Sequence, residues 1–286
     1  MSLKVDIGAL LTPMEPYPTA MVAGGRLAPP IRAVVFDIYG TLLISSSGDI
    51  GTAADPVTPT DQRLRKLASR YGVSLPPDRL RESVTRAITD THRIRKAAGT
   101  RYPEVDIVEI WQSILGWRDR SSLSRFALEY EMTVNPVFPM PGCRDLLNAI
   151  KSASLPMGIV SNAQFYTQPV VEAAIGIGLE DLGFCRELMI FSYQLTVAKP
   201  SRILFERCAD ALSRGGIRPR EAVYMGNDVL KDMLPAGQIG FQTVLFAGDA
   251  RSLRLRETND KCRSIRPDAV ITSLDQLPPL IGIDRS

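Results

Sequence analysis

The chain has 286 residues, of which 45% are hydrophobic and 23% are charged, and its formal net charge is +3. This composition is typical of a folded globular protein and excludes a largely disordered chain. The length allows one large domain or two modest ones. Because the basic residues are scattered along the chain, the charge predicts no nucleic-acid partner.

Apolar runs in this sequence are short, and none approaches the ~20 residues needed to cross a bilayer, so no membrane partner is expected. Prolines and an acid interrupt the N-terminal stretch early, which argues against a signal peptide and predicts a cytoplasmic protein. The four cysteines are far apart and form no C-x-x-C pair. They predict reduced thiols and argue against a zinc site.

In chain order, residues 1–30 contain several prolines and glycines without a clear period and predict an irregular N-terminal arm. The apolar run Val34-Val35-Phe36 then predicts a strand that ends at Asp37. Residues 47–135 show apolar positions at helical spacing and predict an all-helical insert.

From residue 136 to residue 286, apolar strands alternate with helical segments. The runs 157–160, 222–225 and 242–246 are continuously apolar or nearly so, as expected for strands buried on both faces. Strands of this kind that alternate with helices indicate a parallel sheet covered by helices on both sides. The sequence therefore predicts an α/β core, formed by residues 31–46 and 136–286.

Polar side chains stand at comparable places in this core. Asp37, Ser161 and Asp228 each follow an apolar strand, and Lys199 stands just before a predicted helix. In a parallel sheet, these strand ends lie along one rim. A carboxylate on that rim can act as a covalent nucleophile, and a lysine and a hydroxyl can hold the oxygens of a phosphoryl group. Magnesium, which prefers oxygen ligands, can neutralise the charge of such a group.

The order and spacing of these residues resemble the four motifs of the haloacid dehalogenase (HAD) superfamily of hydrolases. The matching segments are Asp37-Ile38-Tyr39-Gly40-Thr41, Ser161-Asn162, Lys199-Pro200, and Gly226-Asn227-Asp228 through Asp232. The match covers about residues 31–46 and 136–280. The resemblance implies a Rossmann-like parallel sheet flanked by helices, with residues 47–135 forming a helical cap that closes over the site.

The resemblance also implies roles for the matching residues. Asp37 would be the covalent nucleophile, and Mg²⁺ would be ligated by its carboxylate, by the backbone carbonyl of Tyr39 and by Asp228. Lys199 would stabilise the nucleophile, and Asp232 would orient Lys199 or a metal-bound water. The candidate catalytic residues are Asp37, Tyr39, Lys199 and Asp232. The candidate substrate-binding residues are Thr41, Ser161, Asn162 and Asn227.

Tyr39 departs from the pattern of the phosphatases in this family, which carry an aspartate two positions after the nucleophile as a general acid and base. A phenol with a pKa of about 10 is a poor base near neutrality. The form D-x-Y-G-T is usual in haloacid dehalogenases, which cleave a carbon–halogen bond without a metal. Asp228 and Asp232 point the other way, because two acids beside Asp37 would repel one another strongly without a cation.

Three hypotheses follow, of which the sequence favours the first: a magnesium-dependent hydrolase of a small phosphorylated metabolite. The second is a haloacid dehalogenase, although none of Arg63, Arg65 and Arg70 has the surroundings expected of its halide-binding arginine. The third is a poorly active relative that binds a metabolite or a protein. For the enzyme hypotheses we expect a small anionic substrate and a monomer or homodimer. The basic cap residues 92–96 favour a solvated helix face, and contact with that substrate is the alternative interpretation.

Overall fold

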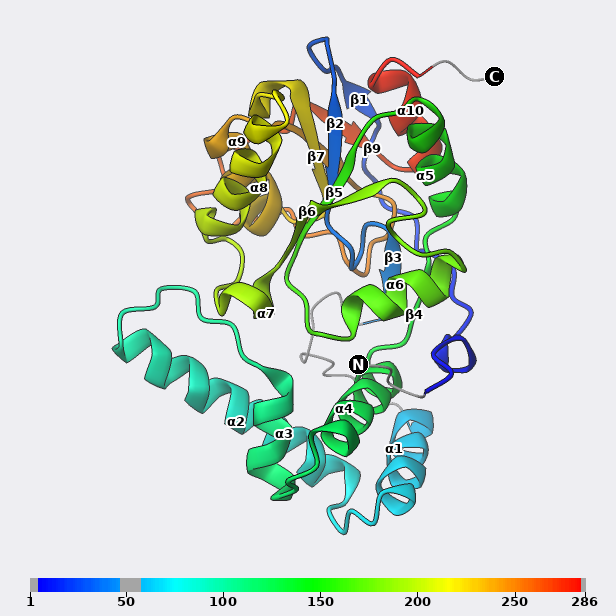
Figure 1. The fold of residues 1–286 in the computed structure, drawn as a ribbon, viewed down its shortest axis with the longest axis vertical. Helices are drawn as coiled ribbons and strands as arrows, with labels where there is room; N and C mark the ends of the chain where they lie inside the picture. Colours follow the sequence, from blue (N-terminus) through cyan, green and yellow to red (C-terminus); the bar gives the residue numbers. More distant parts are fainter. Residues whose placement is uncertain (1–4, 47–57, 284–286) are drawn as a thin grey trace.

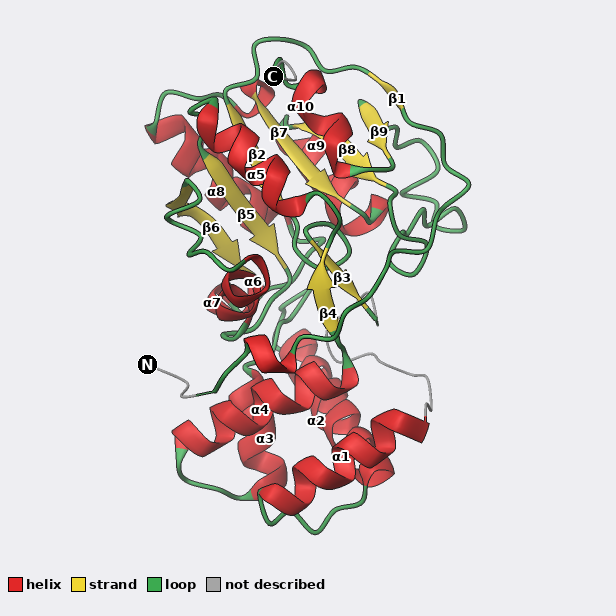
Figure 2. Cartoon of the chain, turned by 90° about the vertical axis from the view of Figure 1, so that its right-hand side faces the viewer, coloured by secondary structure: helices red, strands yellow, loops and turns green. Residues whose placement is uncertain are grey.

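The computed structural model describes residues 5–46 and 58–283 (Figure 1). One part of the molecule contains a large sheet between helices, and the other part contains helices alone (Figure 2). The predicted start of the helical insert at residue 47 lies outside the described residues, as do residues 1–4 of the predicted arm and residues 284–286 of the predicted core. Within the described part, no helix is both long and apolar enough to span a membrane.

The sheet has seven strands in the order β1-β9-β8-β7-β2-β5-β6, and only β1 runs antiparallel to its neighbour. The strands are β1 (Gly24–Gly25), β2 (Ala33–Phe36), β5 (Met157–Ser161), β6 (Phe184–Phe191), β7 (Ala222–Gly226), β8 (Gln242–Phe246) and β9 (Ala269–Ile271). Strand β2, which lies between β7 and β5 inside the sheet, is fully buried along its length. A strand covered on both faces explains the continuous apolar run that predicted it, and the predicted α/β fold class is confirmed.

Successive side chains of β2 point to opposite faces of the sheet, and they pack against two separate layers of the core. Val34 and Phe36 face the cluster that includes helices α5 (Cys143–Ser152), α6 (Thr167–Ile175) and α10 (Leu277–Leu280). Ala33 and Val35 face the cluster that includes α8 (Arg202–Arg214) and α9 (Leu234–Ile239). Figure 1 shows these two helical layers on opposite sides of the strands. The core therefore holds β2 rigidly and fixes the position of the residue that follows it.

The helical part consists of α1 (Thr58–Arg70), α2 (Pro77–Ala97), α3 (Ile107–Leu115) and α4 (Arg120–Val134), which we call the cap. Side chains of Asp106 and Asp119 cap the first turns of α3 and α4 by accepting backbone N–H groups. Trp111 packs edge-on against Phe126 and Tyr130, with ring centroids 4.8 and 4.6 Å apart. The cap thus has an aromatic core of its own.

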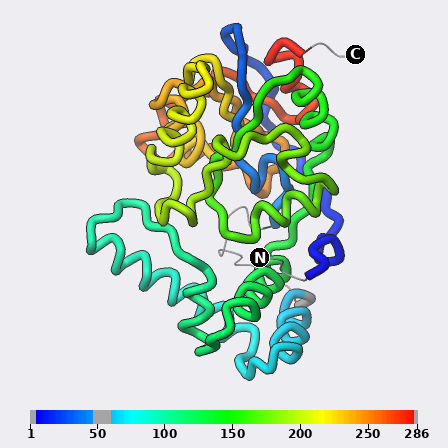
Figure 3. Tube along the Cα trace, viewed as in Figure 1, coloured from blue at the N-terminus to red at the C-terminus, as the bar shows by residue number. Residues whose placement is uncertain are grey.

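Two short strands, β3 (Leu43–Ser45) and β4 (Val137–Pro139), carry the chain between the core and the cap and pair antiparallel. The described part of the N-terminal arm lies along the core and the cap as a continuous tube (Figure 3). It contains a short 3-10 helix, Gly8–Leu10, and strand β1. Tyr17 anchors the arm by stacking under Arg251, 4.0 Å from the guanidinium carbon to the ring centroid.

Candidate active site

Asp37 stands directly after β2, at the carboxyl end of this interior strand. Its backbone N–H donates to the Met225 carbonyl, 2.9 Å away on the neighbouring strand β7. Gly40 then turns the chain with φ +77°, and a Cβ there would lie 2.4 Å from the Asn227 amide nitrogen. The turn therefore requires glycine, and it leaves the Asp37 carboxylate at the rim where ligands bind in open α/β sheets.

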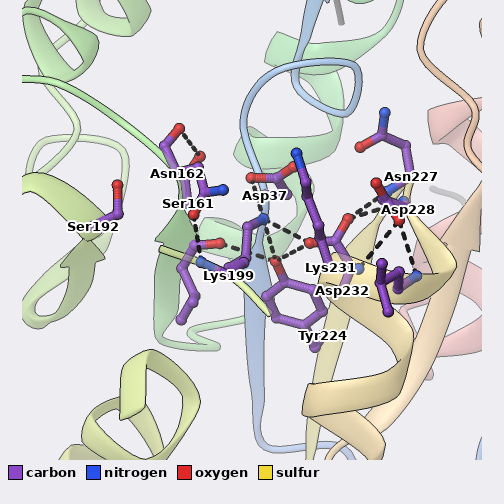
Figure 4. Close-up of polar contacts among 12 residues, drawn as sticks. Asp37, Ser161, Asn162, Ser192, Lys199, Tyr224, Asn227, Asp228, Lys231 and Asp232 are labelled. Atoms are coloured by element: carbon purple, nitrogen blue, oxygen red, sulfur yellow. Dashed lines mark hydrogen bonds and ion pairs between the residues drawn. The ribbon is translucent and has the colours of Figure 1, made fainter. Parts of the chain in front are cut away.

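Lys199 brings the predicted motifs together (Figure 4). Its ammonium lies 2.8 Å from Asp37 Oδ1 and 2.6 Å from Asp232 Oδ1, and it also donates to the Tyr224 hydroxyl at 3.2 Å. Burial alone would lower the pKa of this lysine, but the carboxylates of Asp232 and Asp37 raise the pKa above its usual range. Lys199 is therefore protonated at neutral pH, and its charge offsets that of the Asp37 carboxylate it contacts.

Asp232 fixes the position of Lys199. Its Oδ2 accepts the backbone N–H groups of Asn227 and Asp228 at 3.1 and 2.9 Å, which leaves Oδ1 for the lysine. A Cβ at Gly226 would lie only 2.6 Å from the Asp232 carboxyl carbon, so this close approach requires glycine. Tyr224, which sequence analysis missed, places its hydroxyl 3.0 Å from Asp232 Oδ1.

Ser161 is the last residue of β5, the strand next to β2, and Asn162 follows it. Asn162 Oδ1 accepts the backbone N–H of Lys199 at 2.7 Å, and the Ser161 hydroxyl lies 3.3 Å from the Asn162 carbonyl oxygen. The Thr41 hydroxyl is buried and makes no hydrogen bond within the described residues. Asn227 donates its side-chain N–H to the Ser252 carbonyl at 2.6 Å, so it anchors a neighbouring loop. Binding of substrate by these four residues stays a prediction.

Tyr39 directs its phenol away from this cluster. Within the described residues, its hydroxyl hydrogen-bonds only Thr167 Oγ1, at 3.1 Å on α6. Burial, followed by the nearby carboxylate of Glu131, raises the pKa of Tyr39 far above its ordinary value. The phenol is therefore neutral at any physiological pH and cannot serve as a base.

We expect Tyr39→Phe to leave kcat within about threefold of the unmodified protein and to lower the free energy of unfolding by about 1 kcal/mol, the net value of one hydrogen bond. The substitution removes a hydroxyl whose partner is Thr167 and not the nucleophile. Steady-state kinetics and urea unfolding measure the two quantities. A hundredfold fall in kcat would show that the phenol takes part in the reaction.

Asp228 is held by an arginine that sequence analysis did not single out. The Nη2–H group of Arg256 donates a hydrogen bond to Asp228 Oδ2 at 2.6 Å, and Arg256 Nε lies 3.2 Å from both carboxylate oxygens. Asp228 Oδ1 also accepts the backbone N–H groups of Leu230 and Lys231. Among the described residues, no group of three or more acidic, histidine or cysteine side chains is arranged to hold a metal. The predicted ligand set has only two carboxylates, Asp37 and Asp228, beside the Tyr39 carbonyl, so it stays a prediction. Arg256 would compete with magnesium for Asp228.

Substituting Arg256 tests this competition. Arg256 has φ +56°, a left-handed conformation that glycine adopts without strain. We expect Arg256→Gly to remove the guanidinium without distorting the loop and to lower the magnesium concentration for half-maximal binding by about tenfold, since a fully available carboxylate is a stronger ligand. Calorimetric titration measures this, and Arg254→Gly on the same loop is the control. An unchanged magnesium affinity would show that Asp228 is not a ligand.

A cavity of about 370 Å³ separates the cap from this rim. Its core side includes Asn162, Lys199 and Lys231, and its cap side includes His92, Trp111, Tyr130 and Glu131. A more open hollow of about 880 Å³ lies between the N-terminal arm and helices α1 and α4, and none of the motif residues lines it. The smaller cavity lies between the cap and Lys199, which contacts Asp37. Its size suits a small molecule.

A family model described as haloacid dehalogenase-like hydrolase matches residues 31–240. The chain belongs to this family. The match contains every predicted motif from Asp37 to Asp232, and members of the family are hydrolases. The protein is therefore a HAD-like hydrolase. The search of curated proteins found no match.

Solved structures of both dehalogenases and phosphatases resemble this HAD-like hydrolase. A 2-haloacid dehalogenase from Pseudomonas syringae is 19% identical, with 88% of this chain and 98% of that chain covered and a TM-score of 0.56. A HAD phosphatase from Thermococcus onnurineus is 20% identical over 90% and 100% of the two chains, with a TM-score of 0.52. The magnesium-bound HAD-hydrolase YfnB from Bacillus subtilis is 16% identical over 89% and 100%, also with a TM-score of 0.52. At these identities the likeness shows the fold alone.

Proposed function

We propose that this HAD-like hydrolase cleaves a small phosphorylated metabolite through nucleophilic attack by Asp37. The observation that carries the proposal is the buried contact of 2.8 Å between Lys199 and Asp37, beside the cavity between cap and core. Lys231 adds a second ammonium on the same wall, and Ser161 ends the adjacent strand. Two ammonium groups and a hydroxyl suit the charged oxygens of a phosphoryl group.

The reaction has two steps in this account. Asp37 attacks phosphorus, the bond from phosphorus to the leaving oxygen breaks, and an acyl phosphate forms. Water then attacks phosphorus, which releases inorganic phosphate and restores the carboxylate. Lys199 holds Asp37 in position in both steps, and Asp232 keeps Lys199 oriented. Magnesium, if bound by Asp37, the Tyr39 carbonyl and Asp228, would supply further neutralisation of the phosphoryl charge.

Haloacid dehalogenation is the second candidate, favoured by Tyr39 and by the engagement of Asp228 with Arg256. The arginines considered for halide binding do not support it. Arg70 pairs with Glu129 on the cap, and Arg63 and Arg65 are exposed on α1. The cationic side chains that line the cavity are those of Lys96, Lys199, Lys231 and one arginine, Arg101.

Product release from two substrates distinguishes these functions. We expect the purified protein to release phosphate from p-nitrophenyl phosphate, faster with magnesium than with EDTA, and to release no chloride from 2-chloropropionate. Chloride release in EDTA without phosphate release would instead establish the dehalogenase. Release of neither product, in a protein that still binds phosphorylated metabolites, would identify a binding relative.

A further inference from the structure

A buried carboxyl group of the cap lies at the active-site cavity. Glu131 is on α4, is only 6% exposed, and lines the cavity together with Lys199 and Asn162. Asn135 donates its amide N–H to Glu131 Oε1 at 3.0 Å and accepts a hydrogen bond from the Ser45 hydroxyl at 2.8 Å. This network fixes Glu131 beside β3 and β4, where the cap joins the core.

The proposed reaction lacks one group, because Tyr39 occupies the position from which the phosphatases of this family supply their acid and base. Glu131 and Lys199 line the same cavity, and the Lys199 ammonium lies 2.8 Å from the Asp37 carboxylate. A small substrate that fills this cavity against Lys199 therefore also meets the carboxyl group of Glu131 on the cap side.

We propose that Glu131 is the general acid and base of this hydrolase, a role that rests on the proposed phosphatase function. When Asp37 attacks phosphorus, protonated Glu131 donates its proton to the leaving oxygen, which departs as a neutral alcohol. Glu131, now a carboxylate, then takes a proton from the water that attacks the acyl phosphate. The bond from Asp37 to phosphorus breaks, phosphate leaves, and both carboxyl groups return to their starting states.

The environment of Glu131 suits both halves of this cycle. Burial raises the pKa of Glu131 to about 7, despite the opposing hydrogen bond from Asn135. An acid–base group is most effective when its pKa is close to the working pH. The carboxyl group of Glu131 binds its proton more tightly in the folded state than in the unfolded state. Its contribution to the free energy of unfolding is therefore lost as the pH rises from the ordinary pKa of 4.5 toward 7.

Two other titratable groups on the cavity wall are less suited. The oxygens of Glu104 accept hydrogen bonds from the Ser192 hydroxyl at 2.6 Å and the Val105 backbone N–H at 2.9 Å, so they are engaged in joining the cap to the core. Burial and the neighbouring Lys96 and Arg95 lower the pKa of His92. His92 is therefore neutral at pH 7 and a poor proton donor.

Glu131→Gln tests the proposal, because glutamine can keep the bond from Asn135 but cannot exchange a proton. An alkyl phosphate needs protonation of its leaving oxygen, whereas p-nitrophenolate leaves without it. We expect kcat/KM to fall about 100-fold or more for glycerol phosphate and less than about fivefold for p-nitrophenyl phosphate. With the aryl substrate, rapid mixing should show a burst of about one equivalent of p-nitrophenol before a slow steady state, because the second step has lost its base.

A purely structural role for Glu131 predicts a different result. Equal losses of kcat/KM on both substrates, or no loss on glycerol phosphate, would overturn the proposal. Glu104→Gln is the matched control and should not change the ratio of the two kcat/KM values. If Glu131→Gln does not fold, Glu131→Asp should show the same preference for the aryl substrate in weaker form. Turnover of the aryl substrate by the unmodified protein tests the proposed function separately.

Discussion

Asp37→Asn is expected to lower the turnover of p-nitrophenyl phosphate by about 10⁴-fold or more, because it removes the nucleophile on which both steps depend. An amide is a far weaker nucleophile than a carboxylate and cannot form the acyl phosphate. The fold should survive the change, since Lys199 retains its 2.6 Å contact with Asp232. Phosphate release under substrate saturation measures the effect, and circular dichroism checks the fold.

Asp210→Asn is the matched control for this experiment. Asp210 is an exposed residue of α8, so the same chemical change there should leave turnover within about twofold and stability within about 0.5 kcal/mol. Both variants are purified in the same way to exclude contaminating phosphatases. If Asp37→Asn then keeps more than about 1% of the activity of the unmodified protein, Asp37 is not the nucleophile.

Lys199→Met is expected to lower the free energy of unfolding by about 3–5 kcal/mol, the usual cost of leaving a buried charge uncompensated. Asp37 and Asp232 both contact the Lys199 ammonium, and the lysine side chain is only 2% exposed. Without it, two carboxylates would lie close together in the core. Urea denaturation monitored by tryptophan fluorescence measures the change, and turnover should fall at least 100-fold in the same variant.

A second substitution separates the charge effect from the loss of packing. Lys199→Met combined with Asp232→Asn removes one of the two uncompensated carboxylates and should recover more than half of the lost stability, without restoring turnover. Lys151→Met, at an exposed lysine that donates to the Asp181 carbonyl, should change stability by less than about 0.5 kcal/mol. A loss below 1 kcal/mol in Lys199→Met would contradict the buried ion cluster.

The fold was predictable from sequence because the parallel strands are buried on both faces. Strands β2, β5 and β7 consist almost entirely of apolar residues, and each leads into a polar residue at the same rim. This topology predicts that Asp37, Ser161, Asp228 and Lys199 lie along one rim, and the family resemblance implies that Asp232 orients Lys199. The structure places Asp37 and Asp232 within hydrogen-bonding distance of Lys199, whereas Asp228 is paired with Arg256.

Other features of the site depend on side-chain directions that sequence patterns do not contain. Tyr224 lies inside an apolar strand, so its spacing gives no sign that its hydroxyl reaches Asp232. Arg256 lies in an irregular segment 28 residues beyond Asp228, where no period relates the two. Glu131 follows helical spacing like its neighbours on α4, and only the docking of the cap onto the core brings it to the cavity.

Chemical trapping shows whether Asp37 becomes covalently bonded to the transferred phosphoryl group. Enzyme mixed with p-nitrophenyl phosphate for milliseconds, quenched in acid and reduced with borohydride, can be digested and analysed by mass spectrometry. We expect Asp37 alone to be converted to homoserine, and only when substrate is present. Conversion of a different residue, or phosphate release with undiminished rate in Asp37→Asn, would contradict this expectation.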